Sequence, residues 1–70
     1  MKTIPVAFYK EGDQWVAQAL NVEVSTFADT LEQAKAAIVE ALELYFEGEA
    51  EGDVPEIESV FVDQVDVQVA

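Results

Sequence analysis

The 70-residue sequence contains no cysteine, no histidine and only three basic residues, all of them lysines. Without cysteine the chain can form neither a disulfide nor a thiolate metal site. Without histidine its serines have no imidazole base, so a Ser-His-Asp triad is excluded. The three glycines are scattered and form no phosphate-binding loop. These absences remove most of the catalytic sites that a short sequence can reveal.

The chain also lacks long hydrophobic runs. No stretch approaches the roughly 20 apolar residues of a membrane-spanning helix. Met1–Pro5 has no apolar core of the kind found in signal peptides. We therefore expect one cytoplasmic domain covering residues 1–70. At 51% hydrophobic residues the chain is not expected to be disordered. A domain this short commonly needs a partner for stability, which predicts self-association.

Charge is strongly one-sided, with 15 acidic residues against three lysines and a formal net charge of −12. An acidic surface repels phosphate, so direct nucleic-acid binding is not expected. It attracts basic proteins and accelerates the encounter with them. A surface that serves only solubility explains the same composition, and both interpretations stay open.

Apolar and polar residues alternate in three segments of the N-terminal half, which predicts three strands. Residues 3–10 and 14–20 form the arms of a hairpin around the turn Glu11-Gly12-Asp13. Residues 22–26 form a third strand after a break at Asn21. The first three elements are therefore expected to be consecutive antiparallel strands.

A helix is predicted from Thr30 to Glu47. Thr30 is a suitable N-cap, and Gln33 three residues later completes a capping box. Gly48 is a suitable stop. Its apolar residues recur at helical spacing and form one stripe for packing on a sheet. The stripe comprises Leu31, Ala34, Ile38, Ala41, Leu42 and Tyr45.

The β-rich stretch from Ile57 to Val69 predicts a long fourth strand with a bulge at Asp63-Gln64. A right-handed crossover through the helix places this strand parallel to the first. The fold class is then α+β, with the order β-β-β-α-β, a mainly antiparallel sheet of strand order 3-2-1-4, and one helix on one face. The opposite sheet face stays open to a partner.

Six apolar residues are candidates for contact with a partner or a second copy. On the helix, Val39 lies near the outer arc, and adjacent residues such as Leu44, Tyr45 and Phe46 cannot all face one core. At the chain end an unprotected alternating strand is a pairing hazard unless another subunit uses it. The candidate residues are Val39, Leu44, Phe46, Val65, Val67 and Val69.

The acidic residues raise the possibility of a two-metal nuclease site, with Glu40, Asp63 and Asp66 as the nominees. The first strand, Thr3–Lys10, supplies no carboxylate, so the metal pair lacks its central ligand. We therefore expect no catalytic residues, no metal and no cofactor. A solvated acidic face is the simpler interpretation.

Four runs of residues resemble the HicB-like antitoxin family: Phe8–Ala17, Ser25–Thr26, Asp29–Ala34 and Glu40–Glu47. The resemblance covers about residues 3 to 47. It implies a partial ribonuclease H fold that lacks the nuclease carboxylates. It also implies a partner, a small basic HicA-type toxin that cleaves mRNA. Many family members carry a C-terminal DNA-binding segment, which is not expected here because the sequence ends at Ala70.

The sequence thus predicts a non-enzymatic, antitoxin-type interaction domain that forms dimers or higher oligomers and neutralises a basic toxin. The alternative is a stand-alone homo-oligomer with an unknown regulatory or small-ligand-binding role.

Overall fold

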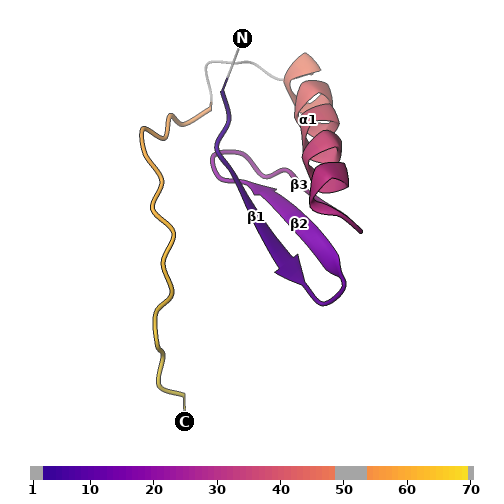
Figure 1. The fold of residues 1–70 in the computed structure, drawn as a ribbon. Helices are drawn as coiled ribbons and strands as arrows, with labels where there is room; N and C mark the ends of the chain where they lie inside the picture. Colours follow the sequence, from indigo (N-terminus) through magenta and orange to yellow (C-terminus); the bar gives the residue numbers. More distant parts are fainter. Residues whose placement is uncertain (1–2, 49–53, 70) are drawn as a thin grey trace.

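The computed structural model describes residues 3–48 and 54–69. Its elements follow the order β1 (Val6–Glu11), β2 (Gln14–Ala19), β3 (Ser25–Ala28) and α1 (Leu31–Glu47). The strands form one antiparallel sheet in the order β1-β2-β3, and α1 packs on one face of it (Figure 1). The predicted α+β class, with three antiparallel strands followed by one helix, is confirmed.

The β1–β2 hairpin closes through a two-residue turn. Glu11 pairs with Gln14, which leaves Gly12 and Asp13 as the loop. Gly12 has a φ of 62°, in the left-handed region that residues with a Cβ avoid. The predicted turn is confirmed, and this glycine accounts for its tightness.

Strand β3 begins at Ser25, three residues later than the predicted start at Val22. The backbone N–H of Ala19 donates to the carbonyl of Val24 at 2.9 Å, which closes a wider turn. Asn21 alone was too short a break, because reversing the chain consumes residues 20–23. The predicted boundaries of the third strand, 22–26, are wrong for this reason.

Helix α1 begins as its sequence predicts. The backbone N–H of Gln33 donates to the Thr30 hydroxyl oxygen at 3.1 Å, so Thr30 is the N-cap. The helix stops at Gly48, whose φ of −104° is ordinary for any residue. From β3, the Thr26 hydroxyl donates to the Ala34 carbonyl at 3.5 Å and joins sheet to helix.

The core lies between α1 and one face of the sheet and is small. Its buried members are Ala17 and Ala19 from β2 and Ala34, Ile38 and Leu42 from α1. Three of these five are alanines, which allow helix and sheet to approach closely but bury little area. Partly buried apolar residues surround this core, among them Val6, Phe8, Trp15, Val24 and Phe46.

The predicted fourth strand is absent from the described residues. Residues 55–69 contain no strand, and they extend away from the sheet as an irregular chain (Figure 1). The expected sheet order 3-2-1-4 is therefore wrong for this structure, because no strand among residues 3–48 pairs with the segment. A strand exists only where neighbouring backbone satisfies its N–H and C=O groups. One side of β1 is consequently an open sheet edge.

Candidate functional site

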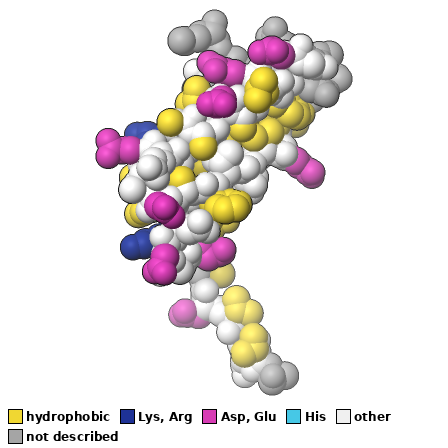
Figure 2. Space-filling model, turned by 90° about the vertical axis from the view of Figure 1, so that its right-hand side faces the viewer, with side chains coloured by type: hydrophobic (Ala, Val, Ile, Leu, Met, Phe, Trp, Pro, Cys, Tyr) yellow, Lys and Arg dark blue, Asp and Glu magenta, His cyan; other side chains and the backbone are white. Residues whose placement is uncertain are grey.

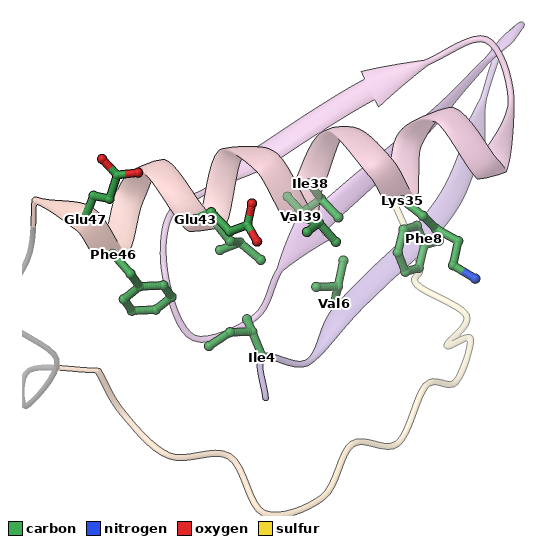
Figure 3. A pocket seen from close by; sticks show the side chains of 10 residues that line it. Ile4, Val6, Phe8, Lys35, Ile38, Val39, Glu43, Phe46 and Glu47 are labelled. Atoms are coloured by element: carbon green, nitrogen blue, oxygen red, sulfur yellow. The ribbon is translucent and has the colours of Figure 1, made fainter. Parts of the chain in front are cut away.

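An apolar groove runs between α1 and the open edge of β1 (Figure 3). Alternate residues of the first strand form one wall, since Ile4, Val6 and Phe8 all point to the helix-bearing face. Residues of α1 at helical spacing form the other wall. The groove has a volume of about 880 Å³. Its lining comprises Ile4, Val6, Phe8, Lys35, Ile38, Val39, Leu42, Glu43, Phe46 and Glu47.

Two of the six predicted contact residues lie in this groove, namely Val39 and Phe46. Val39 is 54% exposed on its helical wall. Phe46 packs against the core and meets the ring of Tyr45 edge to face, with ring centroids 5.2 Å apart. Leu44 is also exposed, but it does not line the groove.

The other three predicted contact residues lie on the extended C-terminal segment, defined here as residues 57–69. Val65, Val67 and Val69 are 80%, 71% and 84% exposed. Phe61 and Val62, earlier in the same segment, are exposed to a similar degree. The segment therefore presents apolar side chains along most of its length, and none of them line the groove of their own chain.

The residues that lead into the C-terminal segment are attached beside the start of β1. The Asn21 side-chain amide donates to the carbonyl of Pro55 at 3.0 Å. Residues 54–60 also border a shallow hollow with Thr3, Ile4 and Pro5. The Oδ1 atom of Asn21 is buried and has no hydrogen-bond partner among the described residues. This attachment fixes where the segment leaves the body of the protein.

The face of the sheet opposite α1 carries a second set of apolar side chains. The register aligns Tyr9 with Val16 and Val16 with Phe27, so these three form one row across all three strands. Phe27 is 66% exposed and Tyr9 44%. None of these three residues was among the predicted contact residues, and Phe27 lay beyond the expected end of the third strand at Thr26.

Acidic side chains are spread over the helix-bearing side of the molecule, and hydrophobic side chains are visible both there and on the projecting segment (Figure 2). On α1 the glutamates Glu32, Glu40, Glu43 and Glu47 are all exposed, and the last turn contains no basic residue. This set of acidic side chains attracts cationic groups.

No three potential metal ligands converge anywhere in residues 3–48 and 54–69. Glu40 lies on α1, while Asp63 and Asp66 lie on the extended segment, so the nominated nuclease set is not brought together in this structure. Asp63 instead accepts a hydrogen bond from the backbone N–H of Gln64 at 2.7 Å. This hydrogen bond joins neighbouring residues of the segment and does not connect Asp63 to α1.

Sequence reasoning missed the first wall of the groove. Ile4, Val6 and Phe8 were expected only as part of the first strand, in a sheet that a fourth strand completes, and they were not nominated as contact residues. Their alternation indicated that they share one face of the strand. They line an open groove only because the fourth strand is absent from the described residues.

Among the described residues, no helix is both long and apolar enough to cross a membrane. Comparisons of the chain with protein-family models, with curated proteins and with solved structures give no match.

Proposed function

We propose that this chain is a HicB-like, non-enzymatic interaction domain of the antitoxin type, which binds and neutralises a small basic mRNA-cleaving toxin. The observation that carries the proposal is the resemblance of four residue runs to that family. These runs correspond to the β1–β2 hairpin, the start of β3 and both ends of α1. The proposal thus rests on residues within the ordered β-β-β-α body rather than on composition alone.

The charge of the chain supports a basic partner. The net charge is −12, and exposed glutamates such as Glu32 and Glu40 lie on the outer surface of α1. Opposite charges on two partners speed their encounter and disfavour wrong partners. A toxin that binds RNA must carry a basic surface, and an acidic domain can cover that surface in place of RNA.

Self-association is part of the same proposal. The body has an open edge at β1 and an exposed apolar row on the far side of the sheet. Apolar patches of this kind mark interaction sites in soluble proteins. A dimer also presents two acidic surfaces, which strengthens binding to a multivalent target.

The test is co-purification of the full chain from its native host, followed by mass spectrometry. The expected partner is a protein of comparable size with a strong basic excess. Purified alone, that partner should cleave mRNA, and an equimolar amount of this chain should stop the cleavage. Capture of no basic protein, or of one whose RNA cleavage is unaffected, would contradict the proposal.

A pair of charge variants sharpens this test. Glu32→Lys with Glu40→Lys reverses charge on α1, outside the groove, and should weaken inhibition at least about tenfold because rim and surface charges set encounter. Glu11→Lys with Asp13→Lys makes the same change in net charge on the β1–β2 hairpin turn. If both pairs weaken inhibition equally, net charge alone acts and α1 is not the binding surface.

A further inference from the structure

The open edge of β1 is ready to accept another strand. The Leu20 N–H donates to the Pro5 carbonyl at 3.0 Å, so the backbone carbonyl of Pro5 points toward β2 and away from the open edge. In an antiparallel ladder this orientation alternates, so the backbone groups of Val6, Phe8 and Lys10 point to the open edge. Unpaired strand edges of this kind are templates for strand addition. The side chains of Val6 and Phe8 line one wall of the groove along this same edge.

The C-terminal segment has the properties of the missing strand. It is already extended, and its last five residues alternate strictly as Val-Asp-Val-Gln-Val. Alternation of this kind gives one apolar and one polar face. Val65, Val67 and Val69 would then enter the groove, while Asp66 and Gln68 would face away from α1.

The chain exposes more area than a compact monomer of its mass. The chain exposes 5915 Å², whereas a folded monomer of this mass is expected to expose about 4,300 Å². The excess of about 1,600 Å² is larger than the roughly 800 Å² that each partner buries in a typical stable interface. Docking the segment into a groove covers two exposed apolar surfaces at once, the segment and the groove.

The position of the segment favours the groove of a second copy. The Asn21–Pro55 hydrogen bond places its start beside the start of β1, where folding back onto its own groove requires only a bend. The segment instead leaves the body (Figure 1), with Phe61 86% and Val69 84% exposed. Residues 61–69 can span about 30 Å when extended, against about 20 Å for the six residues of β1. The free end is therefore long enough to run past the end of β1.

We propose that two copies of this chain exchange their C-terminal segments, each laying residues 60–69 along the β1 edge and into the α1–β1 groove of the other. The exchange is symmetric, so both grooves are filled and assembly stops at a dimer. Each added strand runs parallel to β1, the direction that the β3–α1 crossover assigns to a fourth strand. This inference rests on the self-association part of the proposed function and does not depend on toxin binding.

Engineered cysteines test the exchange directly, because the natural chain contains none. The full chain carries Val39→Cys on the helical wall of the groove together with one cysteine in the segment. The inward series places that second cysteine at Val65, Val67 or Val69, and the matched outward series places it at Asp66 or Gln68. A disulfide needs Cα atoms within about 7 Å, so only side chains facing the groove can reach Val39→Cys. Each variant is oxidised and run on a non-reducing denaturing gel.

The expected result is a covalent dimer that forms at least about tenfold faster in the best inward variant than in either outward variant. Oxidation in urea should abolish this difference. A chain that closes its disulfide within a monomer would overturn the proposal, because its own segment then fills its groove. Equal rates in the inward and outward series would also overturn it. The circular dichroism of each variant before oxidation, which must retain the helix signal, excludes misfolding as the cause.

The same variants separate this inference from the proposed function. A covalent dimer that fails to inhibit any basic toxin would contradict toxin neutralisation and leave the exchange standing. A chain that inhibits a toxin as a monomer would contradict the exchange and leave the proposed function standing.

Discussion

The body of the molecule, which is the β1–β3 sheet together with α1, differs sharply from the C-terminal segment. Both contain alternating apolar residues, but the alternation has opposite results in the two regions. In β2, alternation places Ala17 and Ala19 in the core, at 0% and 3% exposure. In the segment, equally regular alternation leaves Val67 71% exposed. The difference is the presence of a neighbouring strand, since an extended chain becomes a strand only by pairing its backbone. Alternation therefore indicates competence to form a strand, and the available edge decides whether it forms.

The two regions also complement each other. The body has an open β1 edge and a groove that no described strand fills. The segment is an extended chain that pairs with no described strand. Three mutational comparisons test whether the body holds itself together and whether the segment is used.

The largest expected effect is in the core of the body, where two leucines of α1 lie two positions apart. Leu42 is 9% exposed and Leu44 is 63% exposed. Leu42→Ala should lower the free energy of unfolding by about 2–5 kcal/mol because it empties a buried site. Leu44→Ala should change it by less than about 0.5 kcal/mol, as at most exposed positions. Urea unfolding followed by the helix signal measures both. Equal losses would mean that Leu44 is buried in an interface.

The next effect concerns the segment, where Val67→Ser and Gln68→Ser introduce the same residue on opposite sides of the predicted strand. Val67→Ser should lower the free energy of unfolding by about 1–2 kcal/mol per chain, since a valine loses burial. The melting temperature of a dimer rises with protein concentration, and Val67→Ser should make this rise smaller. Gln68→Ser should leave both nearly unchanged. If neither variant changes the melting temperature, the segment is not used and the comparison fails.

The last effect, no larger than the previous one, concerns two glycines that border the body. A Cβ at Gly12 or Gly48 would meet no atom within 4 Å, but only Gly12 has a positive φ. Gly12→Ala should therefore cost about 1–2 kcal/mol through backbone strain alone, and Gly48→Ala less than about 0.5 kcal/mol. Chemical denaturation of the two variants measures this contrast. A larger cost at Gly48 would mean that the end of α1, rather than the hairpin turn, limits the stability of the body.

Local signals in the sequence predicted the body well. The Thr30 cap acts within four residues, and the turn at Gly12 needs only its neighbours, so both could be predicted without a fold. The buried stripe of α1 was also predicted, although only Ala34, Ile38 and Leu42 of its members are buried. Leu31 proved to be exposed because it lies at the first helical position.

Long-range pairing could not be predicted in the same way. The start of β3 depended on how many residues the turn after Ala19 consumes, which the spacing of apolar residues does not show. The fourth strand was predicted from alternation, but its partner lies outside any local window. For the candidate site, Val39 and Phe46 were found from helical geometry, whereas Ile4, Val6 and Phe8 were missed because their exposure depends on that absent strand.

The mass of the full chain in solution tests most directly whether this body is complete without a second copy. Light scattering at micromolar concentration should give twice the 7.7 kDa of one chain, and the Val67→Ser variant should shift that mass toward one chain while keeping its helix. A mass of 7.7 kDa for the unmodified chain would contradict the account, because the segment and the groove would then have no partner.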